Sequence, residues 1–398
     1  CALPICSSSG AAGQGGAATS DARITHQGNQ LNLTSTASGG SVSAGATGGA
    51  ALAQADGTAA RRAVVQSRAS GGTGGATGGD ATATAAATTT AAAGVSLSDA
   101  RASGSGLTVA SATSRGVDAA DTSAYALASG ASGTTTARSV VASGTSTIDL
   151  SAVADVKSTT ASQTSASYDP ATGLNFPNLN GGSNGLQAFS FANGAPNALQ
   201  LNGLLASHPN VAAAVGSGVV IGLGSLGANY GGSGGTRSYT ANALYSFNLS
   251  TSASLTLGLL NMTAYNGGFD TLNFTVKRGG TTLFNDSFTT LAAAQAYFTD
   301  QAKTLTGFTA GTNTVLLSYT LTASSAKGAD ISYLLSRPAG SALAAAPQGA
   351  AERQAALTEN WAAAYQAVAE LRAQAQIDRK STRLNSSHSQ QSRMPSSA

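Results

Sequence analysis

The sequence predicts a mainly β protein with a low-complexity or β-solenoid-like N-terminal region, an antiparallel β-sandwich and one C-terminal amphipathic helix. Three observations predict this class. Residues 7–170 are near-continuous runs of Ala, Gly, Ser and Thr, residues from about 210 to 335 alternate apolar and polar side chains, and residues 350–377 place apolar side chains on one helical stripe. Only 9% of the residues are charged, which is typical of extracellular β proteins rather than of a cytosolic enzyme.

Residues 1–170 are interpreted as a Gly/Ala/Ser/Thr-rich stalk. Large apolar side chains are so sparse that the stalk is either disordered or a β-solenoid, in which small side chains stack into a thin core. The segments Leu107–Ser111, Tyr125–Gly130 and 139–144 echo one another, which favours solenoid-like strands from about 95 to 160. Their spacing is irregular, whereas solenoids usually keep a fixed period, so little order is expected before residue 95. Out-of-frame translation of GC-rich DNA stays open as an alternative for residues 1–95.

A linker at 171–184 leads to the predicted sandwich at 185–337. Side chains two residues apart share an apolar face in five segments, which predicts strands with one buried side. The five sets are Tyr245, Phe247 and Leu249; Leu255, Leu257 and Leu259; Leu272, Phe274 and Val276; Val315, Leu317, Tyr319 and Leu321; and Ile331, Tyr333 and Leu335.

Two local signals punctuate these strands. The stretch Val276–Thr281 contains two glycines that suit a tight hairpin turn. Leu291–Phe298 predicts a short helix, with Thr289 or Thr290 as its N-cap.

A second linker at 338–349 precedes the amphipathic helix 350–377. Its apolar stripe contains Trp361, the only tryptophan of the chain, which is expected to pack on the sandwich or on another segment.

Residues 378–398 match the translation of a sequencing-library adapter and are interpreted as a non-native tail. The chain is therefore interpreted as a fragment whose true termini lie outside it. Without the tail, the 20 basic and 17 acidic residues become 16 of each, so the formal net charge of +3 comes from the tail. Balanced charge gives no reason to expect a nucleic-acid partner. No window reaches the ~18–20 apolar residues of a membrane-spanning helix.

Two glycine-rich motifs invite a ligand-binding interpretation. Gly222–Gly227 fits the GxGxxG pattern of dinucleotide-binding folds, but the glycines that follow exclude the helix that this fold needs, so a glycine-rich strand is expected. Gly71–Asp80 resembles a calcium-binding nonapeptide repeat, yet it supplies a single aspartate where successive turns would have to share the ion.

Titratable side chains form no recognisable catalytic pattern. His26 and His208 are far apart in the sequence, and Asp270, Asp286 and Asp300 are expected in turns rather than in a catalytic cluster. The sequence therefore predicts no catalytic, cofactor-binding or metal-binding residue, and a protein that is not an enzyme. Four asparagines fit the N-glycosylation pattern: Asn248, Asn261, Asn273 and Asn285. Several of them lie on the strand face opposite the apolar one, so they are expected to be exposed.

Residues 239–335 resemble a β-sandwich module of secreted bacterial proteins, of the kind that carry PEP-CTERM sorting tails or belong to repetitive adhesins. The segments that carry the resemblance are 245–257, 267–274 and 287–299. The resemblance implies export and a structural or adhesive role, without defined active-site residues. The sorting signal itself is absent from this sequence.

The function predicted from the sequence is that of a non-catalytic fragment of a bacterial secreted or cell-surface protein, structural or adhesin-like. Its expected partners are a matrix polymer, a glycan or a surface, and its expected location is extracellular or on the outer cell surface. The alternative is an accessory carbohydrate-binding module of an extracellular enzyme. In that case exposed aromatic rings would stack on sugars. The candidates are Tyr230, Tyr239, Tyr265 and Tyr297.

Overall fold

The computed structural model describes residues 15–42, 46–74, 78–117, 120–130, 132–143, 146–157, 187–194, 198–230 and 236–341. All of them belong to the first of two compact units, Cys1–Ala345. The predicted linker at 171–184, most of that at 338–349, the helix at 350–377 and the tail at 378–398 lie outside the described residues.

Nineteen strands and three helices make up the described part. In chain order they are β1 (Ala18–Thr25), β2 (Gln30–Ser38), β3 (Ala51–Ala59), β4 (Arg62–Ser70), β5 (Ala81–Ala92), β6 (Val95–Ser103), β7 (Leu107–Val117), β8 (Asp121–Ser129), β9 (Ser132–Ser143), β10 (Ser146–Lys157), β11 (Gln187–Gly194), α1 (Ala198–Ala206), α2 (Pro209–Val215), β12 (Val219–Tyr230), β13 (Arg237–Leu249), β14 (Ala253–Tyr265), β15 (Thr271–Arg278), β16 (Thr281–Phe288), α3 (Leu291–Phe298), β17 (Gln301–Phe308), β18 (Gly311–Ala323) and β19 (Lys327–Arg337).

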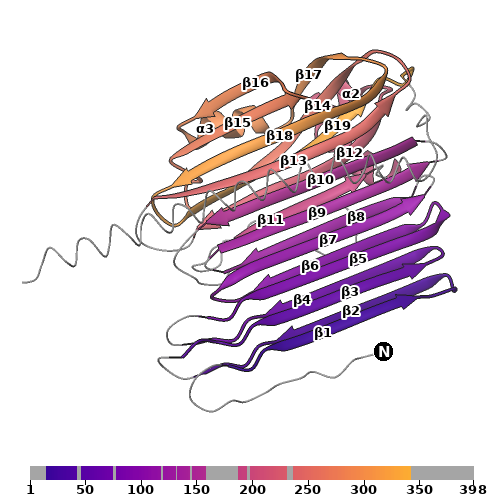
Figure 1. The fold of residues 1–398 in the computed structure, drawn as a ribbon. Coiled ribbons are helices and arrows are strands. Elements are labelled where there is room, and N and C mark those ends of the chain that lie inside the picture. Colours follow the sequence, from indigo (N-terminus) through magenta and orange to yellow (C-terminus); the bar gives the residue numbers. More distant parts are fainter. Residues whose placement is uncertain are drawn as a thin grey trace, which may run out of the picture. The chain divides into compact units, whose positions relative to one another are not determined.

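The strands form two sheets, which confirms the predicted mainly β class (Figure 1). One sheet has ten strands in the order β1-β3-β5-β7-β9-β10-β13-β18-β15-β16, and the other has nine in the order β17-β14-β19-β12-β11-β8-β6-β4-β2. From β1 to β9, successive strands alternate between the two sheets. Within each sheet, every strand pairs in parallel with the strand two positions along the chain. This arrangement is a β-solenoid, in which each coil gives one strand to each sheet.

The expectation of little order before residue 95 is wrong, because the solenoid begins at Ala18. Equivalent positions in the ten-stranded sheet are Ala18, Ala51, Ala81, Thr108 and Gly133, at intervals of 33, 30, 27 and 25 residues. The strands therefore stay in register while the connections between them change in length. A search for a fixed period fails for this reason.

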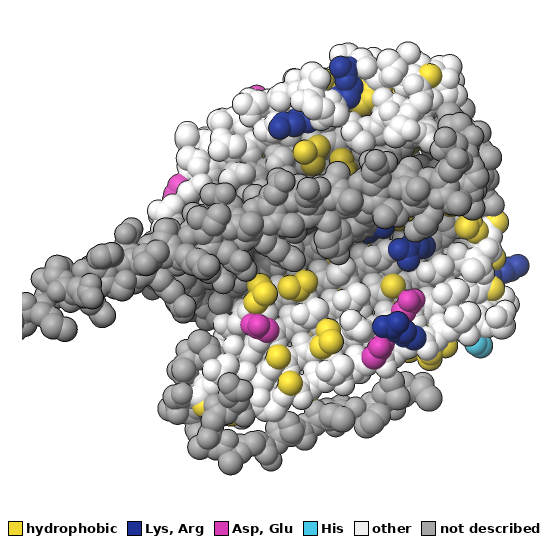
Figure 2. All heavy atoms as spheres, in the orientation of Figure 1, with side chains coloured by type: hydrophobic (Ala, Val, Ile, Leu, Met, Phe, Trp, Pro, Cys, Tyr) yellow, Lys and Arg dark blue, Asp and Glu magenta, His cyan; other side chains and the backbone are white. Residues whose placement is uncertain are grey.

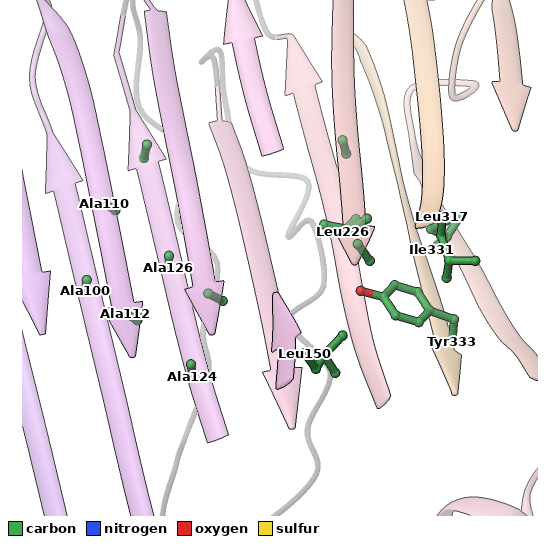
Figure 3. Close-up of a cluster of buried hydrophobic side chains, with 14 of the residues drawn as sticks. Ala100, Ala110, Ala112, Ala124, Ala126, Leu150, Leu226, Leu317, Ile331 and Tyr333 are labelled. Atoms are coloured by element: carbon green, nitrogen blue, oxygen red, sulfur yellow. The ribbon is translucent and has the colours of Figure 1, made fainter. Parts of the chain in front are cut away.

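Alanine fills the inner face of the solenoid. One column of in-register residues in the ten-stranded sheet consists of Ala22, Ala55, Ala85, Ala112 and Ala137, all buried. The nine-stranded sheet has a matching column of Ala37, Ala69, Ala102 and Ala128. Figure 3 follows the core from such alanines to the larger side chains of Leu150, Leu226, Ile331 and Tyr333. A one-carbon side chain buries little area, so many coils must stack before the solenoid is stable.

Backbone hydrogen bonds join the two sheets along one side of the solenoid, past strands β1 to β5, through five glycines that we call the glycine ladder. Its members flank the strands: Gly16 precedes β1, Gly40 follows β2, Gly49 precedes β3, Gly72 follows β4 and Gly79 precedes β5. The N–H of each member after the first donates to the carbonyl of the member before it, at 2.8–2.9 Å.

Only glycine fits at Gly49, Gly72 and Gly79 of this ladder. A Cβ atom on Gly49 would lie 2.1 Å from the Gly16 carbonyl oxygen, and one on Gly79 would lie 1.9 Å from that of Gly49. These obstacles are backbone atoms, which cannot swing aside as a side chain would. The Gly-Gly pairs that contribute to the ladder therefore reflect close backbone packing rather than flexibility.

Both sheets continue from the solenoid into antiparallel strands. β9 pairs with β10 and β10 with β13 in the ten-stranded sheet, whereas β8 pairs with β11 and β11 with β12 in the nine-stranded sheet. One cluster of buried apolar side chains extends from Ala18 to Leu335. The sheets and their core thus run across the boundary expected at residue 170.

The predicted sandwich faces are confirmed. Every residue of the five alternating sets is buried, with 2% exposure or less. The hairpin β15–β16 turns at Gly279, whose φ of +53° favours glycine. Helix α3 has the predicted bounds, and the Thr290 Oγ1 atom accepts from the Ala293 N–H at its N-terminus.

Helices α1 and α2 were not expected from the sequence. Their residues Leu204, Val211 and Val215 form a second apolar cluster with Tyr125, Leu223 and other side chains of the nine-stranded sheet. This cluster covers the side of that sheet that faces away from the main core.

Candidate functional site

A depression of about 290 Å³ lies on the outer side of the ten-stranded sheet, near its β16 edge. Its lining comes from three adjacent strands: Thr275 and Lys277 of β15, Thr282 and Asn285 of β16, and Leu316 and Ser318 of β18. The register arranges these residues in two rows, Ser318–Thr275–Asn285 and Leu316–Lys277–Thr282. They face outward because Leu272, Phe274 and Val276 alternate with them into the core.

A β-bulge lies beside the depression. Val276 is opposite Phe284, and the next residue, Lys277, is opposite Thr282, so Leu283 is an extra residue in β16. A bulge bends its strand and increases the local twist. We attribute the hollow at this position to that irregularity.

The lining provides hydrogen-bonding groups and one cation. The Thr275 hydroxyl donates to Asn285 Oδ1 at 3.0 Å, which leaves the Asn285 amide nitrogen available to donate. Next to it, the Ser287 hydroxyl donates to Asn273 Oδ1 at 2.6 Å. The six lining residues offer hydroxyl, amide, ammonium and aliphatic groups, and they include no carboxylate, imidazole or thiol. They are suited to binding a polar ligand.

The two glycine motifs have structural roles. Gly222–Gly227 lies within strand β12, as expected from the sequence, and the next described element is strand β13. In the stretch 71–80, Gly72 and Gly79 belong to the glycine ladder, and Asp80 Oδ1 accepts from the Leu107 N–H at 2.7 Å.

The three aspartates do not converge, and each stabilises a different local contact. Asp270 pairs with Lys327 at 2.6 Å, and this hydrogen bond lowers the pKa of the Asp270 carboxyl. Asp286 accepts from the Tyr297 hydroxyl at 2.7 Å. Asp300 accepts from the N–H groups at the start of α2, at 3.0 and 3.1 Å, and so caps that helix.

The two histidines are also separate. His26 is exposed after β1, and His208 lies before α2, where its Nδ1 atom is 2.7 Å from the Leu204 carbonyl oxygen. Among the residues that the structure describes, no group of three or more His, Cys, Asp or Glu side chains could hold a metal ion.

Among the side chains that the structure describes, the tyrosines proposed for sugar stacking do not form an exposed flat surface. Tyr297 is half-buried, and its ring centroid lies 5.0 Å from those of both Phe288 and Phe298. The Lys303 ammonium lies 4.3 Å from the centroid of the same ring. Tyr265 is half-buried, and the side chains of Tyr230 and Tyr239 lie outside those described.

In the sequence, the depression is indicated only by the polar side chains that the strands direct outward. Of the four glycosylation-pattern asparagines, Asn261, Asn273 and Asn285 are exposed and Asn248 is half-buried. Asn285 belongs to the lining, and Asn273 lies next to it in the same strand pair. Sequence reasoning identified these asparagines as exposed, but it did not identify Thr275, Lys277 or Ser318.

The described residues visible in Figure 2 present a mostly uncharged surface, over which Lys, Arg, Asp and Glu side chains are scattered. In the described part of the chain, no helix is long and apolar enough to cross a membrane.

No protein-family model and no curated protein matches the chain. Several solved structures resemble part of it. One is a family 35 carbohydrate-binding module from Clostridium thermocellum, with 16% identity and a TM-score of 0.16, over 26% of this chain and 80% of that one. Another is TmCBM61, solved with β-1,4-galactotriose, with 10% identity and a TM-score of 0.14, over 28% of this chain and 70% of that one.

A third is the family GH115 4-O-methyl-α-glucuronidase BtGH115A, with 16% identity and a TM-score of 0.17. The match covers 28% of this chain but 14% of the enzyme. These TM-scores are too low to support a conclusion about function, and the likeness is one of β architecture in part of the chain.

Proposed function

We propose that the protein is a non-catalytic, adhesin-like component of a bacterial surface or secreted matrix that binds glycans. Its contact surface would be the outer side of β15, β16 and β18. The observation that carries the proposal is the depression lined by hydroxyl, amide and ammonium groups, with no carboxylate among its lining residues.

The chemistry of the lining suits a sugar. Hydroxyl and amide groups can both donate and accept, as the hydroxyls of a glycan do. The volume of about 290 Å³ is just below the ~300–1,000 Å³ usual for ligand clefts, so it suits one ring of a polymer. One such site would bind weakly, and adhesion would then depend on many copies that engage a repetitive polymer together.

The test is binding of the full chain to a panel of immobilised polysaccharides, before and after the depression is filled. Ser318→Phe puts a ring in the depression and is expected to reduce binding at least about tenfold, because the ring occupies the space of the ligand. Thr84→Phe is the matched control. Thr84 is a half-buried, outward-facing residue of β5 in the same sheet, and its replacement is expected to leave binding unchanged. Thermal unfolding of both variants checks that the fold is kept.

A second, milder variant covers the case in which Ser318→Phe does not fold. Asn285→Ala removes an exposed amide from the lining and is expected to weaken binding without a change in thermal stability. The proposal is wrong if no polysaccharide in the panel is retained, or if the depression variants bind as the parent chain does.

An accessory carbohydrate-binding module of an enzyme is the second candidate, favoured by a depression that matches a single sugar ring. Competition separates the two. A short soluble oligosaccharide would displace an accessory module fully at concentrations well above its own Kd. A multivalent adhesin on a surface would be displaced only by the polymer.

A further inference from the structure

The depression contains an isolated positive charge. Lys277 is the single charged residue among those that β15, β16 and β18 direct outward. Its outward neighbours carry hydroxyl, amide or aliphatic groups: Asn273, Thr275, Thr282, Asn285, Ser287, Thr314, Leu316, Ser318 and Thr320. The nearby charged residues of these strands, Arg278 and Asp286, pair with inward-facing Val315 and Phe274 and so lie on the other side of the sheet.

Other cations of this region have partners, whereas Lys277 has none among the described residues. Lys327 pairs with Asp270 at 2.6 Å, and Arg278 donates to the Thr306 carbonyl at 2.7 Å. Lys303 lies over the Tyr297 ring. The Lys277 ammonium, in contrast, lines a depression whose other five residues are uncharged.

We propose that the depression selects uronate-containing glycans, with the Lys277 ammonium as the group that binds the sugar carboxylate. This inference rests on the proposed glycan-binding function and adds the class of sugar. A carboxylate would receive a charge-assisted hydrogen bond from the Lys277 ammonium, while the hydroxyls of the ring would meet Thr275, Asn285 and Ser318.

The single positive charge of Lys277 favours a ligand with one carboxylate per ring over a ligand with many negative charges. A ring with one carboxylate matches one cation in a neutral surrounding. A heavily sulfated polymer carries several negative charges per repeat and would favour a cluster of basic side chains, which the lining does not have.

The experiment compares two polymers that differ mainly in charge, polygalacturonate and its methyl-esterified form, as ligands of the full chain. We expect the parent chain to bind polygalacturonate about tenfold more tightly than the ester, and to lose this preference as the salt concentration rises. Lys277→Gln is expected to bind both forms equally, at the level of the ester. Lys277→Arg keeps the charge and is expected to retain the preference.

Arg61→Gln is the control for the loss of one positive charge. Arg61 is an exposed residue of the turn between β3 and β4, outside the depression, and its replacement is expected to keep the preference for the acidic polymer. Alginate, a second uronate polymer, tests whether the preference follows the carboxylate rather than one sugar.

The outcomes separate the two proposals. If neutral glycans bind and Ser318→Phe abolishes that binding, but Lys277→Gln changes nothing, the uronate inference is wrong and the glycan-binding function stands. If no polymer binds, or if binding ignores the depression variants altogether, both are wrong. Equal loss of the acidic preference in Lys277→Gln and Arg61→Gln would also overturn the inference, because net charge alone would then explain it.

Discussion

Replacing Gly49 by alanine is expected to lower the free energy of unfolding by about 3 kcal/mol, because the new methyl group has no space. Its carbon would lie 2.1 Å from the carbonyl oxygen of Gly16 and 2.7 Å from the carbonyl carbon. The backbones must separate, and this breaks hydrogen bonds of the glycine ladder, each of which contributes about 1 kcal/mol. Urea denaturation followed by circular dichroism measures the change.

Gly203→Ala is the matched control for this substitution. Gly203 lies within helix α1, and an added Cβ there has no atom within 4 Å. Alanine favours a helix over glycine by about 1 kcal/mol, so this variant is expected to be as stable as the parent or more so. A Gly49→Ala protein as stable as the parent would show that the backbones are not in close contact.

Phe274→Ala is expected to lower the free energy of unfolding by about 3–5 kcal/mol, the usual range for a buried phenylalanine. Phe274 is fully buried on β15, and its ring centroid lies 5.0 Å from that of Phe298 on helix α3, in a T-shaped contact. The truncation leaves a cavity between the sheet and the helix. The helix is therefore expected to lose part of its attachment as well.

Denaturation measures the total effect, and proteolysis near residues 291–298 reports on the helix. Tyr297→Phe is the milder control, since it removes the hydrogen bond to Asp286 but keeps the ring, and a loss of about 1 kcal/mol is expected. A loss below about 1 kcal/mol for Phe274→Ala would contradict the close packing of α3 on β15.

The sandwich could be predicted from the sequence because its strands contrast large apolar side chains with polar ones. Leu272, Phe274 and Val276 alternate with Asn273 and Thr275, and this contrast fixes which side of the strand is buried. The hairpin and helix α3 were predictable from local signals, two glycines and a threonine cap.

The solenoid was harder to predict because its alternation is between alanine and threonine. In β5 the inner residues Ala81, Ala83 and Ala85 alternate with Thr82 and Thr84, and these two small residue types differ less in size and hydropathy than phenylalanine and asparagine do. Connections of changing length then hide the repeat. The Gly-Gly pairs were the available signal, but as a sequence feature they are equally typical of flexible segments.

The depression could not be predicted because it depends on register between three strands. Lys277 and Leu316 are far apart in the sequence and adjacent in the sheet. The bulge at Leu283 also has no clear sequence signal. Reasoning from the sequence gave outward asparagines on this side, whereas the neighbouring threonine, serine and lysine side chains looked like any exposed strand residues.

Amide hydrogen exchange over residues 15–157 tests the central claim, that the Ala/Gly/Ser/Thr-rich region is a folded solenoid continuous with the sandwich. We expect protection of strands β3 to β9 comparable to that of β13 and β18, and slow exchange at the N–H groups of Gly49 and Gly72, because all of these amides donate to backbone carbonyls. Exchange throughout residues 15–117 at the rate of an unstructured chain would contradict the account.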